Sequence, residues 1–326
     1  MQNNFWKNKN ILITGYEGFV GSHLTLALLQ YQANVFGLDI LTRRKNTILT
    51  NDSSKINIIK GSVADYDLVY KIIIQNKIEF IFHLAATSLV GEALADPLET
   101  FSTNIRGTWN ILEASRHSKF TKGAIIASSD KAYGIKNKLP YREDSSLCGC
   151  HPYDVSKSCA DLLAYTYFHT YGLPVCITRC GNIFGPGDFN FSRIVPDAIR
   201  SIIKNKTLII RSDGKFTRDY IYIKDIISGY LLLAENMQNL KISGEAFNFS
   251  NESPLSVLEL VKIISRLSGK QKPNYKITNQ AKYEIKYQYL SAAKAKKILK
   301  WRPHHKLEAA LKETIKWYQD YFAKRS

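Results

Sequence analysis

The stretch NILITGYEGFVGSHL, residues 10–24, decides the fold class of this chain. It opens with an apolar run typical of a buried strand, passes through Gly15, Gly18 and Gly21, and ends where an amphipathic helix begins. The first glycine permits a tight turn, the second lets backbone approach a pyrophosphate, and the third allows the helix to pack on the strand. Because a helix N-terminus holds an anion well, this stretch predicts a dinucleotide-binding site.

An acidic residue at the end of the second apolar run supports that prediction. Asp39 closes VFGLDI, at about the distance where a carboxylate hydrogen-bonds the adenosine ribose and repels a 2′-phosphate. NAD is therefore favoured over NADP as the cofactor. The nearby Arg43 and Arg44 keep NADP open, because an arginine there accommodates a 2′-phosphate.

Apolar strand-like runs alternate with helix-length amphipathic segments through the first half of the chain. This rhythm predicts an α/β fold, a Rossmann-type doubly wound parallel sheet with helices on both faces. The expected strands cover 10–15, 34–40, 80–86 and 123–129, and the expected helices cover 21–32, 64–76, 101–118, 152–168 and 306–322. We expect residues 1–178, with about 219–250, to form an NAD-binding Rossmann domain, and residues 179–218 with 251–326 to form a smaller substrate-binding lobe.

Bulk composition narrows the class of protein. The 326 residues carry 45 Lys and Arg against 28 Asp and Glu, but the lysines are scattered and no nucleic-acid-binding motif accompanies them. A solvated basic surface is preferred to nucleic-acid binding. The five cysteines show no metal-binding spacing, and no apolar run approaches membrane-spanning length. We therefore expect a cytoplasmic protein with no metal site and no membrane contact.

Tyr153 and Lys157 stand four residues apart in the helical segment PYDVSKSCADLLAYTYF. This spacing puts the phenol and the ammonium on one helical face, where the positive charge is expected to lower the pKa of the tyrosine. By itself, the pair would also suit an ordinary amphipathic helix.

A glycine loop of this spacing followed by Y-x-x-x-K resembles the short-chain dehydrogenase/reductase superfamily, specifically its extended branch acting on nucleotide sugars. The motifs HLAA (83–86), TNIRGTWNILEA (103–114), RCGNIFGPGD (179–188) and RDYIYIKD (218–225) share the resemblance. It implies a nucleotide-sugar substrate and a homodimer in which the helices around 98–118 and 152–171 pair into a four-helix bundle. The alternative is that their apolar faces pack inside the monomer.

The resemblance also implies roles for individual residues. Tyr153 would deprotonate a sugar hydroxyl, Lys157 would orient the nicotinamide ribose, and Ser129 would hydrogen-bond the reacting oxygen. The implied cofactor-binding residues are Gly15, Gly18, Phe19, Val20, Gly21, Asp39, Ser62, Val63, Leu84, Ala86, Tyr153 and Lys157. Many relatives carry an aspartate where this chain has Ser62. The implied substrate-binding residues are Thr87, Asn182, Arg193 and Arg218, with Arg200 and Arg211 as alternatives for phosphate.

The stretch IIASSDKAYG, residues 125–134, places an acid beside an amine at a strand end. In the family's 4-epimerases the residues after the catalytic Ser or Thr are small and unreactive. In its 4,6-dehydratases they are Asp-Glu or, in the CDP-glucose type and the N-acetylglucosamine dehydratases, Asp-Lys. Oxidation at C4 of a hexose acidifies the C5 proton, so Lys131 as base and Asp130 as acid would eliminate water. These roles require burial to lower the pKa of Lys131 and raise that of Asp130; the alternative is a solvated turn.

These inferences converge on an NAD-dependent NDP-hexose 4,6-dehydratase that makes a 4-keto-6-deoxy sugar by C4 oxidation, water elimination and hydride return to C6. CDP-glucose is favoured because the aromatic-Trp dipeptide in FWKNKNILITG also begins that type. One alternative is a nucleotide-sugar epimerase, which would not need Asp130 and Lys131. Another is a non-catalytic NAD-binding or nucleic-acid-binding protein that keeps the fold.

Overall fold

Seven parallel strands form the central sheet of the computed structural model, which describes residues 4–42, 46–49, 52–270, 272–281 and 284–325. The strand order is β11-β6-β5-β4-β1-β2-β3. The strands are β1 (Asn10–Thr14), β2 (Asn34–Asp39), β3 (Ile56–Lys60), β4 (Phe80–His83), β5 (Gly123–Ala127), β6 (Val175–Cys180) and β11 (Ala246–Phe249). The order reverses between β1 and β4, so the carboxyl ends of these two strands open a crevice of the kind that binds ligands in doubly wound sheets.

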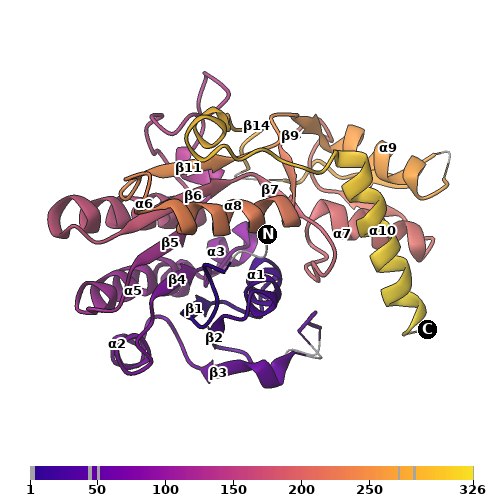
Figure 1. Cartoon of the computed structure of the whole chain (residues 1–326). Coiled ribbons are helices and arrows are strands. Elements are labelled where there is room, and N and C mark those ends of the chain that lie inside the picture. The colour runs from indigo at the N-terminus through magenta and orange to yellow at the C-terminus, as the bar shows by residue number, and fades with distance from the viewer. Residues whose placement is uncertain (1–3, 43–45, 50–51, 271, 282–283, 326) are drawn as a thin grey trace.

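Helices cover both faces of this sheet, which confirms the predicted fold class (Figure 1). On one face α1 (Phe19–Gln30) packs beside α8 (Ile223–Asn236). On the other face α5 (Gly107–Arg116) packs between α2 (Tyr66–Gln75) and α6 (Pro152–Tyr171). In the described part of the chain, none of the helices combines the length and the apolar character that crossing a membrane would require.

The segment expected as one helix over 101–118 is helical but not uniform. It begins within α4 (Pro97–Phe101), which follows α3 (Val90–Ala95), and widens into a π-helical turn, η2 (Ser102–Arg106), before α5. Such wide turns inside helices are frequent at functional sites. Strands β3, β6 and β11 were not among the expected strands. Each has only four to six residues, too few to show a clear periodicity.

The remaining elements follow β6 and build a smaller lobe. Figure 1 shows α7, α9 and α10 on the right of the view, away from α2 and α5 on the left. Three small sheets join these helices, with strand orders β10-β7, β12-β9-β14 and β13-β8. The bounds are β7 (Asn182–Phe184), α7 (Ile194–Ile203), β8 (Leu208–Ile210), β9 (Thr217–Arg218), β10 (Tyr220–Tyr222), β12 (Leu255–Ser256), α9 (Val257–Leu267), β13 (Tyr275–Ile277), β14 (Tyr287–Gln288) and α10 (Leu307–Ala323), with the short turn η4 (Ala295–Leu299). Two other short turns, η1 (Ser53–Lys55) and η3 (Asp130–Tyr133), precede β6.

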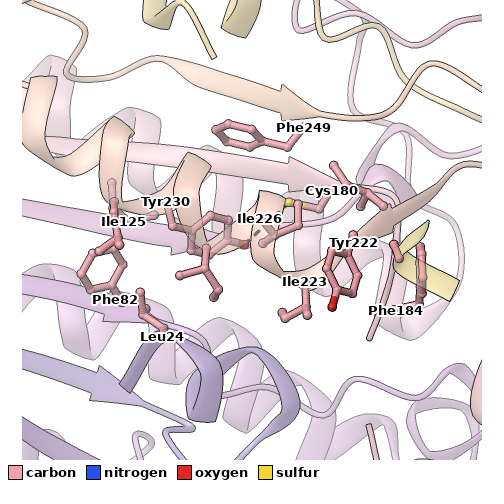
Figure 2. Close-up of a cluster of buried hydrophobic side chains, with 14 of the residues drawn as sticks. Leu24, Phe82, Ile125, Cys180, Phe184, Tyr222, Ile223, Ile226, Tyr230 and Phe249 are labelled. Carbon is pink, nitrogen blue, oxygen red and sulfur yellow. Dashed lines mark hydrogen bonds between the residues drawn. The ribbon is translucent and has the colours of Figure 1, made fainter. Parts of the chain in front are cut away.

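The apolar core under α8 reaches the carboxyl edge of the sheet, as Figure 2 shows. The ring of Tyr230 of α8 lies 6.2 Å from the Phe249 ring of β11, and its hydroxyl is 3.7 Å from the Cys180 sulfur at the end of β6. A side chain at Gly229 would meet the Phe249 ring at 2.6 Å, so the glycine lets α8 approach β11 closely. The packing therefore holds the end of β6 rigidly, next to the cavity described below.

The N-terminal aromatic pair belongs to this core. Trp6 is fully buried, its ring meets Phe80 edge-on at 5.3 Å, and its Nε1 donates to Glu235 Oε1 at 2.5 Å. Phe5 contacts the same two rings. The dipeptide that favoured the CDP-glucose type therefore has a packing role, joining the start of the chain to α8 and β4.

Candidate active site

Two adjoining cavities lie at the carboxyl edge of the sheet. The glycine-loop cavity, about 660 Å³, is lined by the loop between β1 and α1. The Lys131 cavity, about 640 Å³, is lined by the turn after β5, by α6 and by the smaller lobe. Both are lined by Phe19, Val20, Leu84, Ala86 and Arg193, so together they form one continuous cleft.

The glycine loop has the geometry that its spacing predicts. Gly15 has φ 70°, a left-handed conformation that glycine adopts without strain. A Cβ on Gly21 would lie 2.1 Å from the Gly15 carbonyl oxygen, so only a glycine lets α1 pack against the loop. Gly18 is the N-cap of α1 and has no side chain to cap it, which leaves the first N–H groups of the helix to an anion. The loop is built to hold a phosphate group.

Asp39 and its neighbours complete the glycine-loop cavity. Asp39 is buried at the carboxyl end of β2, where one carboxylate oxygen accepts the Leu41 N–H at 3.1 Å. The lining includes every expected cofactor-binding residue outside α6, namely Gly15, Gly18, Phe19, Val20, Gly21, Asp39, Ser62, Val63, Leu84 and Ala86. Arg43 and Arg44, on which the NADP alternative rests, lie outside the described residues.

Thr87, an expected substrate-binding residue, lines the glycine-loop cavity. Its backbone is held by Asn104 of η2, whose Oδ1 accepts the Thr87 N–H at 2.8 Å and whose Nδ2 donates to the Thr87 carbonyl at 3.1 Å. The same Nδ2 lies 2.9 Å from Ser156 Oγ of α6. Asn104 thus ties the cavity wall to the tyrosine-bearing helix. The sequence signal for it was an asparagine inside a helix, where this residue type is unfavourable without a specific partner.

Five residues expected to be catalytic come together in the Lys131 cavity. Ser129, Asp130 and Lys131 come from the turn after β5, and Tyr153 and Lys157 from the first two turns of α6. Ser129 Oγ is the cap of η3, accepting the Lys131 N–H at 3.2 Å and donating to Asp130 Oδ1 at 3.1 Å. The turn η3 packs directly on α6, and this contact brings the two sequence motifs side by side.

Asp130 is buried and Lys131 is half-buried, so the alternative of a turn with a solvated acid and amine is wrong. Asp130 is 3% exposed, and burial raises its pKa to about 6 against the opposing charges of Lys131 and Arg218. Burial, followed by the charge of Arg218, lowers the pKa of Lys131 although Asp130 and Asp154 oppose this. Both pKa directions required for the acid and base roles are confirmed.

The expectation for the tyrosine pKa is wrong for the protein chain alone. Tyr153 and Lys157 do share a helical face, with Lys157 Nζ 6.0 Å from the tyrosine ring centroid. Yet burial raises the pKa of Tyr153 to about 12, and a hydrogen bond with Ser129 only partly opposes this. Burial also lowers the pKa of Lys157 to about 8, and its amine donates to the Ala127 carbonyl at 2.8 Å. Desolvation of the phenolate therefore outweighs the attraction to the lysine.

Three arginines line the Lys131 cavity together with Asn182 of β7. Arg218 is buried and anchored, since its Nη1 donates to the carbonyls of Thr217 at 2.9 Å and Lys286 at 3.1 Å. Arg193 begins α7, and Arg211 follows β8. Guanidinium groups that line one cavity suit the binding of phosphate oxygens.

Arg200, the other arginine considered for phosphate, points elsewhere. Its Nη2 donates to Asp197 one turn earlier in α7 at 2.5 Å, and its guanidinium lies 4.5 Å from the Phe191 ring centroid. The structure therefore separates Arg211, which lines the cavity, from Arg200, which packs on the surface of the lobe.

Other cavity residues were not singled out from the sequence. They are chiefly Asp188, Tyr220, Tyr230, Gln280 and Glu284. Asp188 lines both cavities and accepts from Arg193 Nη1 at 3.1 Å, and its backbone carbonyl accepts the Tyr318 hydroxyl of α10. It lies inside a quoted motif, FGPGD, whereas Gln280 and Glu284 belong to a segment without any recognisable pattern.

No grouping of three or more His, Cys, Asp or Glu side chains that could hold a metal ion occurs within the described ranges.

Comparisons with known proteins place this geometry in context. A family model described as GDP-mannose 4,6 dehydratase matches residues 12–314. The CDP-glucose 4,6-dehydratase of Salmonella typhimurium is 31% identical over 334 residues, covering 97% of this chain and 92% of that protein. A dTDP-glucose 4,6-dehydratase from Streptomyces venezuelae, solved with NAD bound, superposes with a TM-score of 0.88 at 26% identity, covering 97% of this chain and 98% of that one. A UDP-glucose 4-epimerase from Thermotoga maritima, solved with UDP-glucose, gives 0.87 at 28% identity, covering 96% and 99%.

Proposed function

The chain belongs to the GDP-mannose 4,6-dehydratase family. Given this family and a CDP-glucose 4,6-dehydratase among the relatives, we propose that the chain converts CDP-glucose to the 4-keto-6-deoxy derivative. Like the relatives described above, it is an NAD-dependent nucleotide-sugar 4,6-dehydratase. The observation that carries the proposal is a buried acid, Asp130, next to a half-buried amine, Lys131, with Tyr153 lining the same cavity. The choice of CDP-glucose is supported by the Salmonella relative, since other similar proteins act on dTDP and UDP sugars.

The glycine-loop cavity fits NAD. The cradle formed at Gly15 and Gly21 would receive the pyrophosphate, and the Asp39 carboxylate would accept from the adenosine ribose and repel a 2′-phosphate. Lys157 would hold the nicotinamide ribose where the two cavities meet. When bound, NAD accepts hydride from C4 of the sugar and later returns it to C6.

Tyr153 would remove the proton of the C4 hydroxyl while Ser129 hydrogen-bonds the same oxygen. Because burial alone raises the pKa of Tyr153 to about 12, its action as a base depends on positive charge entering the cleft with the bound cofactor. Lys157, on the same helical face, adds to that charge when protonated. We therefore expect the tyrosine to become basic only in the loaded enzyme.

Elimination would be the work of the Asp130 and Lys131 pair. The neutral Lys131 amine takes the C5 proton while protonated Asp130 gives its proton to the C6 hydroxyl, so the C5–H and C6–O bonds break and water leaves. Lys131 then returns its proton to C5. The proton that Tyr153 gained balances the one that Asp130 lost, so the sugar loses one water and nothing else.

The smaller lobe would bind the nucleotide diphosphate. We propose that residues 179–218 and 251–326 form this lobe, with residues 1–178 and about 219–250 forming the NAD-binding domain. Arg193 and Arg218 would grip the phosphates, with Arg211 added from the cavity lining. Asn182 would hold a diphosphate or sugar oxygen, and Thr87 would contact the sugar where the cavities adjoin.

We also propose a homodimer built from α4, α5 and α6. Large apolar side chains stand exposed on these helices, with Leu98 80%, Leu162 55% and Trp109 43% exposed. These helices are in contact through α6, and large apolar side chains exposed on neighbouring elements favour a protein interface. Pairing across a two-fold axis would cover these side chains in a four-helix bundle.

The experiment that tests the proposed function is a substrate panel. The purified protein with NAD is incubated with CDP-, dTDP-, UDP- and GDP-hexoses, and mass spectrometry records the loss of one water. We expect dehydration of CDP-glucose, and a decrease of about 10²- to 10⁴-fold in Lys131→Ala, the effect of removing a general base. Lys136→Ala is the control, because this lysine lies on the loop beyond η3 and bonds to Ser146.

Three other outcomes would redirect the assignment. A product of unchanged mass with an inverted stereocentre indicates an epimerase, and dehydration of another nucleotide sugar replaces CDP-glucose as the substrate. No turnover of any donor contradicts an enzyme and favours a binding protein.

A further inference from the structure

The amine of Lys131 has a hydrogen-bond partner from a distant part of the chain. Lys131 Nζ donates to the side-chain amide oxygen of Gln288 at 3.4 Å, across 157 residues of sequence. Gln288 belongs to β14 of the smaller lobe and is only 1% exposed. It does not line the cavity, whereas Lys131 does.

Strand β14 also connects Gln288 with the arginine on the cavity wall. It pairs in parallel with β9, and in this register Gln288 lies opposite Arg218. Arg218 lines the cavity and is itself tied to this strand pair through the Lys286 carbonyl. One small sheet, β12-β9-β14, thus carries both a proposed phosphate-binding group and the partner of the amine.

The Gln288 amide uses only its oxygen for hydrogen bonding among the described residues. Its Nε2 is buried and makes no hydrogen bond among the described residues, whereas its Oε1 faces Lys131. Burying an amide N–H without a partner costs stability, and an apolar side chain of similar size would avoid that cost. The oxygen therefore accounts for the presence of a glutamine.

We propose that Gln288 is a positioning residue that orients the Lys131 amine for proton abstraction. Its oxygen accepts one N–H of the amine, which leaves the nitrogen lone pair free to face the cavity and the sugar. This inference rests on the proposed function in so far as Lys131 is the base. It goes beyond that function by assigning the geometry of the base to a residue of the substrate lobe.

A neutral partner suits a base that must be uncharged. The charged groups that face Lys131 are Asp130 on η3, Asp154 on α6, Arg218 on β9 and Glu284 in the segment before β14. A carboxylate in place of the amide would stabilise the ammonium form strongly, whereas an amide oxygen stabilises it only weakly. Gln288 therefore holds the amine in place without cancelling the effect of burial.

Two substitutions at this position should act in opposite directions on the acidic limb of the kcat–pH profile. Gln288→Leu removes the acceptor, so the ammonium form loses a hydrogen bond and the limb moves to lower pH. Gln288→Glu supplies a carboxylate, so the limb moves up by about one pH unit or more. In Gln288→Leu we expect kcat to fall about 10- to 100-fold, with KM changed less than about threefold, because the base loses its orientation. Tyr287→Phe is the matched control, because this neighbour in β14 is 58% exposed.

A second measurement reads the amine without turnover. Trace acetylation of the folded protein with acetic anhydride over a pH series, followed by peptide mass spectrometry, gives the titration of Lys131 directly. We expect its midpoint to fall in Gln288→Leu, rise in Gln288→Glu and stay unchanged in Tyr287→Phe. Circular dichroism of each variant checks that the fold is retained.

The two measurements distinguish a failure of the proposed function from a failure of the positioning role of Gln288. If the panel yields no dehydrated sugar, the proposed function is wrong, while the labelling still decides whether Gln288 sets the state of Lys131. If dehydration occurs but both Gln288 variants leave the pH limb and the labelling midpoint unmoved, the positioning role is wrong and the dehydratase stands. Shifts in the same direction for Leu and Glu would likewise contradict the proposal, because they would indicate general disruption.

Discussion

Burial controls the chemistry of individual residues in this cleft. It raises the pKa of Asp130 and Tyr153 and lowers that of Lys131 and Lys157, in each case favouring the neutral form. An elimination needs a protonated acid beside a neutral amine, and both shifts raise the fraction of each group that is in that form. The same burial costs stability whenever one of these groups becomes charged.

Replacing Asp130 with its neutral isostere should reveal that cost. Its pKa rises from 3.8 to about 6 on folding, so its stabilising contribution is present below about pH 4 and is lost as pH rises through about 6. Asp130→Asn should therefore gain stability relative to the parent between pH 4.5 and pH 8, by at most about 3 kcal/mol. Urea unfolding at both pH values measures the difference.

The control for this comparison is Asp144→Asn, which changes an exposed loop carboxylate by the same atoms. We expect Asp144→Asn to show no comparable change between the two pH values. If Asp130→Asn also gains nothing at pH 8, the carboxyl is not carrying a burial penalty, and its assignment as a protonated acid fails.

At the scale of elements, three packing contacts decide where the site residues lie. The first is the contact of α1 with the glycine loop, and the second is the contact of η3 with α6. The third, smaller contact is the β9–β14 strand pair, in which Gln288 lies opposite Arg218 of the cavity wall. Each contact brings together two segments, neither of which forms the binding or catalytic site by itself.

The contact of α1 with the glycine loop can be tested by adding one methyl group at Gly21. In Gly21→Ala the new Cβ would meet the Gly15 carbonyl oxygen at 2.1 Å, and a backbone atom cannot move aside as a flexible side chain can. We expect a loss of about 1–3 kcal/mol in the free energy of unfolding and NAD binding at least about tenfold weaker, because α1 must shift away from the loop. Urea unfolding and calorimetric titration with NAD measure the two effects.

Gly91→Ala is the matched control, since a Cβ there has no heavy atom within 4 Å. Its helical position predicts unchanged or slightly higher stability. Equal stability and equal NAD affinity in Gly21→Ala and the parent would show that α1 does not depend on this close approach.

On the scale of the whole molecule, the cleft exists because a second lobe is built onto one edge of the sheet. The sheet provides the glycine loop and the turn η3, while β7, α7 and β9 provide the opposite wall. The helices α4, α5 and α6 carry exposed apolar side chains on the surface of the sheet domain. That surface is where the proposed dimer would form.

A charge placed on that surface should separate the subunits. We expect the parent chain of 37.1 kDa to behave as a dimer in light scattering, and Leu162→Arg to behave as a folded monomer, because the guanidinium would be buried without a partner. Ile209→Arg is the control, since Ile209 is exposed on β8 of the other lobe. A monomeric parent, or a Leu162→Arg variant that stays dimeric, would contradict the bundle.

The sequence by itself determined the features that depend on local spacing. The alternation of apolar runs set the doubly wound sheet, because each run must bury its apolar side within one element. The glycine spacing set the turn at Gly15, and four-residue spacing set the shared face of Tyr153 and Lys157. The acid and amine at Asp130 and Lys131 were also singled out from the sequence, by their place after an apolar run and by the family resemblance.

Only the tertiary structure decided the features that depend on long-range packing. It separated Arg211 from Arg200, brought Gln288 to Lys131, and placed the N-terminal aromatic pair in the core. It also reversed the expected direction of the Tyr153 pKa, because the depth of burial, which sequence spacing does not encode, outweighs a nearby charge. Contacts and desolvation arise from segments that meet only after folding, and for this reason no local pattern carried them.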